Sequence, residues 1–244
     1  ALTGLWWFCF SQITFKSLPR GEKIRIKDKS TYQKGILELN KVRLYIMKTK
    51  RLKRFIYSFF VYSMAVQTIM LVAVYFGTKE VNWGEGANAK MGLIIGVLLI
   101  QLIAIPGAIL LSKISKFKGN LFALKLVVFI WILLCLSALL VYEPIHFYLI
   151  SGFVGLVMGG IQSLSRSTYS KYIPSGTKDT SSFFSFYDIS EKLGIVIGMF
   201  SYGFIEQVTG SMRNSIVALV VFFIVGLLLL FQVPKEEISI ESYG

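Results

Sequence analysis

Six long apolar runs constrain the fold of this chain more than any other feature of its sequence. A helix needs about 20 predominantly apolar residues to cross the hydrocarbon core of a bilayer. Six segments meet that length, at residues 55–77, 91–112, 121–142, 146–164, 183–208 and 213–233. The sequence therefore predicts an all-α membrane protein whose six helices form one transmembrane bundle over residues 55–233.

A seventh apolar run, at residues 1–15, is rich in aromatic side chains but too short to cross a bilayer. The chain begins with Ala1 rather than Met, and no basic segment precedes the run, so a signal peptide is not expected. We expect residues 1–15 to be the end of a truncated helix. The chain is then a fragment, the C-terminal piece of a longer protein.

The overall composition excludes several classes of protein. Of 244 residues, 55% are apolar and only 16% are charged, against about a quarter charged in ordinary soluble domains. A typical soluble enzyme, a disordered chain and a coiled coil are therefore not expected. The formal net charge of +13 would suggest a nucleic-acid partner in a soluble protein. No nucleic-acid partner is expected here, because the basic residues have a topological explanation.

That explanation lies in how the basic residues are distributed among the connections. Residues 16–54 contain fourteen Lys or Arg and three acids, whereas residues 78–90 contain two Lys and two Glu. Cytoplasmic loops of membrane proteins carry the excess of Lys and Arg. We therefore expect the basic loop 16–54 and the tail 234–244 to be cytoplasmic, and residues 78–90 to lie outside. The same loop is also expected to be attracted to anionic lipid.

Polar residues divide the six runs into two groups. Runs 121–142 and 213–233 are almost uniformly apolar, which is typical of helices that face lipid. The other four runs carry polar residues or glycines; Gln67 lies near the middle of the first run and Gln101 near the middle of the second. These four helices are expected to face protein rather than lipid.

Two glycine pairs predict close contacts between helices. Gly155 and Gly159 form one GxxxG pair, and Gly194 and Gly198 form another. Such pairs permit the backbones of neighbouring transmembrane helices to approach each other. The pattern is a packing signal and carries little functional information by itself.

The charges inside run 183–208 are the strongest functional signal in the sequence. Asp188, Glu191 and Lys192 interrupt an apolar segment, and Tyr187 lies on the same stripe as the two acids. If the helix begins at Phe183, Glu191 lies about 12 Å inside it, at 1.5 Å per residue. Asp188 and Lys192 are four residues apart and are expected to pair. The cluster is either a substrate or proton site, or a gate, or a structural ion pair that joins two helices.

Two more polar residues lie at the end of the preceding helix. Gln162 and Arg166 are four residues apart and therefore share a helix face. We expect Arg166 to meet Asp188 or Glu191 near the cytoplasmic mouth of the bundle. The alternative is that Arg166 is only an anchor at the cytoplasmic interface.

Motifs of catalysis and of metal binding are not found in the sequence. His146 is the only histidine, and Cys9 and Cys135 both lie in apolar runs, where we interpret them as small buried hydrophobic residues. The chain shows no Ser/His/Asp constellation, phosphate-binding loop or dinucleotide fingerprint. We therefore expect no enzyme activity, no catalytic residues, no metal and no cofactor.

Three sequence blocks resemble a known family. They are GGIQSLSRSTYSKYIP at 159–174, SFFSFYDISEKLGIVIG at 182–198 and TGSMRNS at 209–215. Together with the Trp pair at residues 6 and 7, they make the chain similar to the C-terminal half of major facilitator superfamily transporters of the vacuolar effluxer-like branch. One departure is Lys116, which stands where the superfamily's loop motif has an acid, so a gating pair centred on that acid is not expected in this half.

The resemblance implies a fold of twelve helices, of which this chain holds helices seven to twelve and the end of helix six. It implies a secondary active transporter that moves a small solute, with amino acids as a candidate substrate, by alternating access. The implied partners are the N-terminal half of the same protein, the lipid bilayer and the solute, with protons as a candidate coupling ion. The expected location is a bacterial inner membrane. A non-transporting membrane scaffold or a channel subunit is the alternative.

The pathway or gate residues expected from the sequence are Gln67, Gln101, Gln162, Arg166, Tyr187, Asp188, Glu191 and Lys192.

Overall fold

The computed structural model describes residues 2–17, 29–84, 89–174, 177 and 180–234, without the side chains of residues 29–32 and 34. Within these residues the chain is helical and contains no strand. The helices are α1 (Leu2–Ser17), α2 (Lys29–Lys48), α3 (Lys50–Glu80), α4 (Ala89–Lys118), α5 (Asn120–Ala138), α6 (Pro144–Tyr172), α7 (Thr180–Thr209) and α8 (Met212–Phe231). The predicted tail 234–244, beyond Pro234, lies outside the described residues.

The chain divides into two compact units, residues 1–37 and residues 38–244. In the first unit, α1 is a single helix whose side chains are largely exposed, and Trp6 lies against Phe10 with ring centroids 4.4 Å apart. Cys9 is exposed there, so the expectation that both cysteines are buried is wrong for Cys9. Cys135, in the second unit, is buried as expected.

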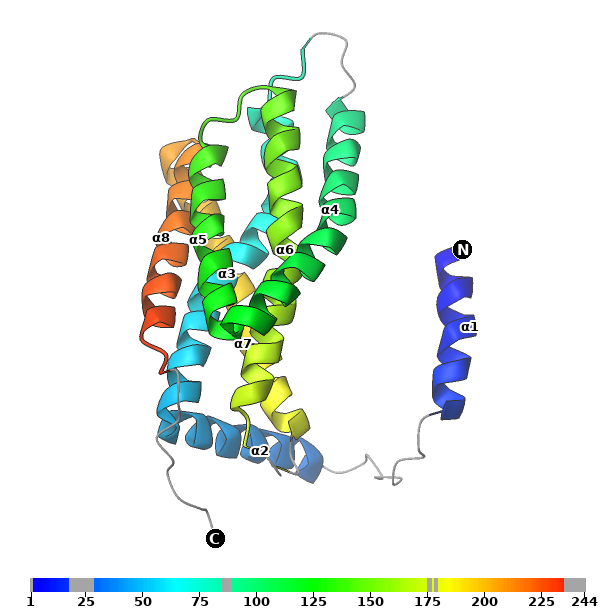
Figure 1. Cartoon of the computed structure of the whole chain (residues 1–244), viewed down its shortest axis with the longest axis vertical. Coiled ribbons are helices and arrows are strands. Elements are labelled where there is room, and N and C mark those ends of the chain that lie inside the picture. The colour runs from blue at the N-terminus through cyan, green and yellow to red at the C-terminus, as the bar shows by residue number, and fades with distance from the viewer. Residues whose placement is uncertain (1, 18–28, 85–88, 175–176, 178–179, 235–244) are drawn as a thin grey trace. The chain divides into compact units, whose positions relative to one another are not determined.

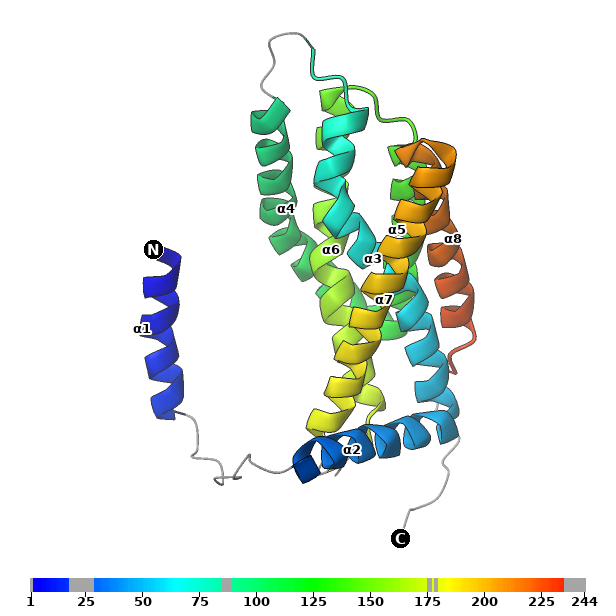
Figure 2. The ribbon, with the colours of Figure 1, turned by 180° about the vertical axis from the view of Figure 1, so that it is seen from behind.

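The second unit is a bundle of six long helices (Figures 1 and 2). α3 packs against α7 and α8, α4 packs against α6, and α5 packs against both α6 and α8. Residues 38–48 of α2 lie across one end of this bundle and bury Val42 and Ile46 in its core. We call this the α2 end, and the opposite end, where Trp83 lies, the Trp83 end.

Five of the bundle helices are long and apolar enough to cross a membrane: α3, α4, α5, α6 and α8. α7 has 30 residues, as many as α4, and packs against α3 and α8. Its composition sets it apart, because Asp188, Glu191, Lys192 and Glu206 interrupt its apolar sequence. The chain is thus an integral, multi-pass membrane protein in which α7 carries charged residues inside the helix, whereas those of α3 and α4 lie near the helix ends.

Several helices extend beyond their predicted ends. The predicted loop 16–54 contains α2 and the first turn of α3, α4 continues to Lys118, and α6 continues to Tyr172. The apolar runs mark only the part of a helix that suits hydrocarbon, whereas polar residues can continue the backbone hydrogen bonding into the interface. In the other direction, α5 ends at Ala138, four residues before its predicted end.

Glycines let α4 and α6 pack backbone to backbone, as the first GxxxG pair predicts. A Cβ atom on Gly155 would lie 2.6 Å from the carbonyl oxygen of Ile100, and one on Gly159 would lie 3.0 Å from that of Ala104. Gly107 follows Pro106 in α4, which bends along its length (Figure 1), and it touches the backbone of Leu156. We call this contact between α4 and α6 the glycine seam.

The second pair, Gly194 and Gly198, is also confirmed as a packing signal. It brings α7 against α3, and a Cβ atom on Gly198 would lie 2.7 Å from the carbonyl oxygen of Met64. On the other side of α3, Ser58 donates a hydrogen bond of 2.7 Å to the carbonyl of Gly226 in α8. α3 is thereby held closely between α7 and α8.

Replacing Gly155 by alanine is expected to lower the stability of the bundle. The new methyl group would force α4 and α6 apart, because it meets a carbonyl oxygen that cannot move independently. Overpacking of this kind costs about 1–3 kcal/mol, against a gain of at most about 1 kcal/mol in helix propensity. The measurement is the thermal unfolding midpoint in detergent. Gly203→Ala is the control, since nothing lies within 4 Å of its Cβ position; equal midpoints for the two variants would contradict the seam.

Candidate functional site

A polar cavity of about 140 Å³ lies between α3, α6 and α7, inside the bundle. Five of the residues expected from the sequence line it. They are Gln67, Gln162, Arg166, Tyr187 and Glu191. A cavity with a carboxylate, a guanidinium and two amides inside a membrane-spanning bundle is a candidate passage for a polar solute.

Glu191 is the acid that faces this cavity. α7 begins at Thr180, which places Glu191 about 16 Å along the helix, deeper than its predicted depth. The amide Nε2 of Gln67 on α3 donates a hydrogen bond to its carboxylate. The close approach of α3 and α7 at Gly194 and Gly198 makes this contact possible. The carboxylate is therefore held by a neutral donor, not by a cation.

Asp188 is paired with Arg166. The distance between Arg166 Nη2 and Asp188 Oδ1 is 2.7 Å, which confirms the predicted meeting of Arg166 with an acid of α7. Both side chains are about half exposed, at 56% and 49%. The guanidinium also lies over the rings of Phe184 and Tyr187, at 5.6 and 5.8 Å from their centroids. Arg166 thus joins the end of α6 to the first half of α7.

The predicted pair of Asp188 with Lys192 does not form. Asp188 is bound by Arg166 instead, and the ion pairs among the described residues do not include Lys192, whose side chain is exposed. The spacing of four residues makes such a pair possible on an isolated helix. In the bundle, Arg166 of α6 lies within 2.7 Å of Asp188 and pairs with it instead.

Three of the expected residues, Gln101, Asp188 and Lys192, do not line the cavity. Gln101 is exposed on α4, the helix with the least buried apolar segment of the five membrane spans. Their place in a pathway therefore stays a prediction, as does the lipid-facing position of α5 and α8.

Buried aromatic and hydroxyl groups support the cavity, and one of them, Ser165, was not expected from the sequence. Tyr62 and Ser165 share a buried hydrogen bond of 2.7 Å between their hydroxyls, which joins α3 to α6. The ring of Tyr187 stacks on Phe59 at 4.0 Å and lies 5.0 Å from the ring of Tyr169. The available signal was spacing, since Ser165 is three residues from Gln162 on the same face of α6.

A second cluster, which the sequence did not predict, surrounds Arg213 at the Trp83 end. Arg213 Nε lies 2.8 Å from Oε2 of Glu80, and both side chains are largely buried, at 17% and 22% exposure. Its other nitrogens donate to the main-chain carbonyls of Glu80, Leu139 and Val141, and it lies 4.0 Å from the ring centroid of Tyr142. One side chain therefore joins the ends of α3 and α5 to the start of α8. We call this cluster the Arg213 clasp.

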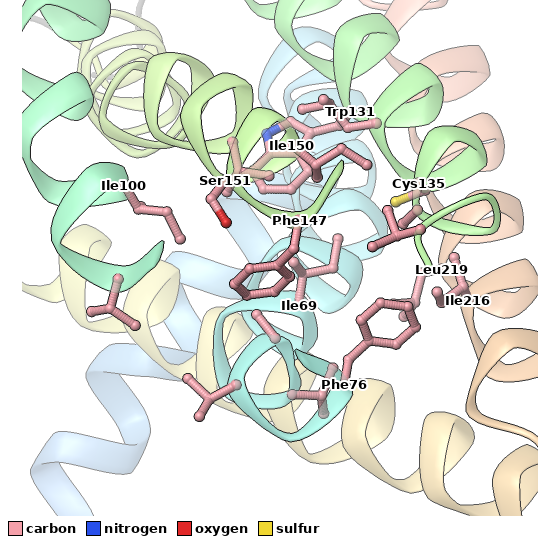
Figure 3. Close-up of a pocket in the computed structure, with 18 of the residues that line it drawn as sticks. Ile69, Phe76, Ile100, Trp131, Cys135, Phe147, Ile150, Ser151, Ile216 and Leu219 are labelled. Atoms are coloured by element: carbon pink, nitrogen blue, oxygen red, sulfur yellow. The ribbon is translucent and has the colours of Figure 1, made fainter. Parts of the chain in front are cut away.

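A second cavity, of about 100 Å³, is unsuited to a polar solute. Its wall is almost entirely apolar, with Phe147 and Ile150 of α6 facing Trp131 and Cys135 of α5 (Figure 3). A polar solute entering it would give up hydrogen bonds to water without replacing them. The polar cavity at Glu191 is therefore the better candidate for a transport site.

Long apolar helices packed around a cavity with ionisable side chains define a multi-pass membrane protein with a candidate polar pathway. Residues 1–241 match the family described as vacuole effluxer Atg22 like, and the chain belongs to that family. The family and its relatives agree with the resemblance to the vacuolar effluxer-like branch of the major facilitator superfamily.

Relatives of the chain include bacterial and fungal proteins. It is 26% identical over 236 residues to the uncharacterized MFS-type transporter YxiO of Bacillus subtilis (strain 168), covering 96% of this chain and 53% of that protein. It is 26% identical over 258 residues to autophagy-related protein 22 of Pichia angusta, covering 91% of this chain and 45% of that protein. The chain thus spans about half the length of these relatives. No solved structure matches it.

Proposed function

We propose that this chain forms one half of a secondary active transporter that moves a small polar solute across a membrane by alternating access. The observation that carries the proposal is the contact of Gln67 with Glu191 in the polar cavity between α3, α6 and α7. A carboxylate at that depth in a membrane-spanning helix is costly, and such residues usually belong to a substrate or ion pathway. The transporter name of the bacterial relative supports the same class.

The finer parts of the proposal concern the solute, the coupling ion, the partner and the membrane. Amino acids are the proposed solute, and their charged groups would find a carboxylate, a guanidinium and two amides in the cavity. Protons are the proposed coupling ion, with Glu191 and Asp188 as the groups that could carry them. An N-terminal half of the same protein would form the opposite wall of the pathway, and the bacterial relative favours a bacterial inner membrane.

The test is solute flux with the full-length protein in liposomes, measured across a panel of amino acids and other small solutes with and without a pH gradient. Saturable flux of one solute class, driven by the gradient, is the expected result. A protein that is folded and correctly inserted but moves none of the solutes would favour the scaffold reading. Flux that is fast and does not saturate would favour a channel subunit.

The orientation of the bundle gives a separate prediction. Asn82 is exposed at the Trp83 end and Asn40 is exposed on α2. In a variant without the exposed Cys9, a cysteine at Asn82 should react with a membrane-impermeant thiol reagent from the outside only. A cysteine at Asn40 should react from the cytoplasmic side only, because residues 16–54 carry the basic excess. Labelling of Asn82→Cys from the cytoplasmic side would reverse the topology.

A further inference from the structure

A basic groove opens between α3 and α8 near the α2 end of the bundle, away from the polar cavity. It has a volume of about 480 Å³. We define the basic groove by the residues that line it: Lys50, Lys53, Arg54, Tyr57 and Val61 of α3, Leu229 of α8, and Gln232 directly after it. We propose that the basic groove is a binding site for one anionic phospholipid, with its phosphate at the three cations and an acyl chain along Val61 and Leu229.

The groove follows one face of α3. Its residues recur at intervals of three and four, which places them in a single stripe along the helix. The stripe begins with cations at Lys50 and Arg54, continues with Tyr57, and becomes apolar at Val61. Over about 16 Å of helix, the surface thus changes from charged to apolar in the order that a phospholipid presents from its headgroup to its chain.

The charge in the groove is of one sign. Three cations line it and, among the residues that the structure describes, no acid does. Among the described residues, none of the ion pairs includes Lys50, Lys53 or Arg54. Arg54 donates one hydrogen bond of 2.6 Å to the main-chain carbonyl of Gln232, which fixes its guanidinium at the rim of the groove. The rim is therefore a set of donors with a net positive charge that suits a phosphate group.

The position of the groove along α3 matches the depth of a lipid headgroup. α3 has 31 residues, which at 1.5 Å per residue is longer than the hydrocarbon core of about 30 Å. Its first turn, with Lys50 and Lys53, therefore reaches the headgroup layer. Tyr57, whose hydroxyl contacts Met47 of α2, occupies the interface that tyrosines favour. A free anion would use the rim but leave the apolar part of the groove unexplained.

The test is binding of a fluorescent phosphatidylglycerol to the purified full-length protein in detergent, with the phosphatidylcholine analogue as reference. The double variant Lys50→Gln and Lys53→Gln should bind phosphatidylglycerol about thirtyfold more weakly, since each cation near an anionic surface contributes about fivefold. Binding of the phosphatidylcholine analogue should not change. The control is Lys113→Gln and Lys116→Gln, the same charge change on exposed residues of α4 outside the groove, which should bind normally.

Further experiments distinguish a bound lipid from other molecules or segments that could occupy the basic groove. Val61→Trp, which keeps all the cations but fills the apolar part, should also weaken phosphatidylglycerol binding. Glycerol phosphate alone should not compete with the lipid. Competition by glycerol phosphate, or normal binding by Val61→Trp, would overturn the lipid proposal in favour of a free anion.

Residues 235–244 include Glu236, Glu237 and Glu241. If the lipid binds only after these residues are removed, the acidic tail occupies the groove and the proposal fails. Equal binding by both double variants would also overturn it.

Discussion

Replacing Arg213 by alanine is expected to destabilise the bundle by about 3–5 kcal/mol, the cost of removing one partner from a largely buried ion pair. The change would leave the Glu80 carboxylate without its cation. It would also leave three main-chain carbonyls, at Glu80, Leu139 and Val141, without their donor. Two of these carbonyls lie just past the end of α5, where the helix dipole adds to the attraction for a cation.

Unfolding midpoints in mild detergent would measure the loss of stability. Two further variants serve as comparisons. Arg213→Lys keeps the charge but not the planar set of donors, so its stability should lie between wild type and Arg213→Ala. Lys79→Ala removes a nearby, exposed cation whose distance to Glu206 is 3.9 Å, and should change stability by less than about 1 kcal/mol. If Arg213→Ala and Lys79→Ala behaved alike, the Arg213 clasp would carry no special role in stability.

Replacing Glu191 by glutamine is expected to reduce turnover by about tenfold or more, which corresponds to about 1.4 kcal/mol in the barrier for transport. A glutamine can still accept the hydrogen bond from Gln67, so α3 and α7 should remain in contact. What is lost is the negative charge and the proton that it could carry. Folded yield should therefore survive while turnover, or its dependence on pH, changes.

The same substitution elsewhere on α7 provides the control. Glu206→Gln changes an acid of the same helix at the Trp83 end, outside the polar cavity, and should leave turnover unchanged. If Glu191 only anchors the helix, Glu191→Gln should lower folded yield but leave the turnover of each folded molecule intact. Normal yield together with normal, normally pH-dependent transport would contradict both roles.

The sequence predicted the bundle and its tightest contacts well, because both depend on local composition. A run of apolar residues is itself the requirement for crossing a bilayer, and the glycines at 155 and 159 remove the side chains that would keep two backbones apart. Helix ends were predicted less well. Polar residues such as those between Leu164 and Tyr172 extend α6 into the interface without any apolar signal.

Contacts between side chains of different helices could be predicted from the sequence only in part. Arg166 meets Asp188 because a short connection returns the chain beside itself, so the proximity follows from the order of the helices. Gln67 lies 124 residues from Glu191, and no spacing rule relates them. The partners of Arg213 were also hidden, since most of them are main-chain carbonyls, which every residue has. The i,i+4 rule named Lys192 for Asp188 and was wrong, because it considers one helix alone.

The glycine seam has a consequence for how this half could move during a transport cycle. Helices in contact through their main chains cannot slide or separate by exchanging side-chain rotamers, so α4 and α6 form a stiff pair. Reporter groups on these two helices should keep a constant separation while the solute crosses. The changes in distance that accompany alternating access should then appear between this bundle and its opposite half, as rocking of one rigid body against another.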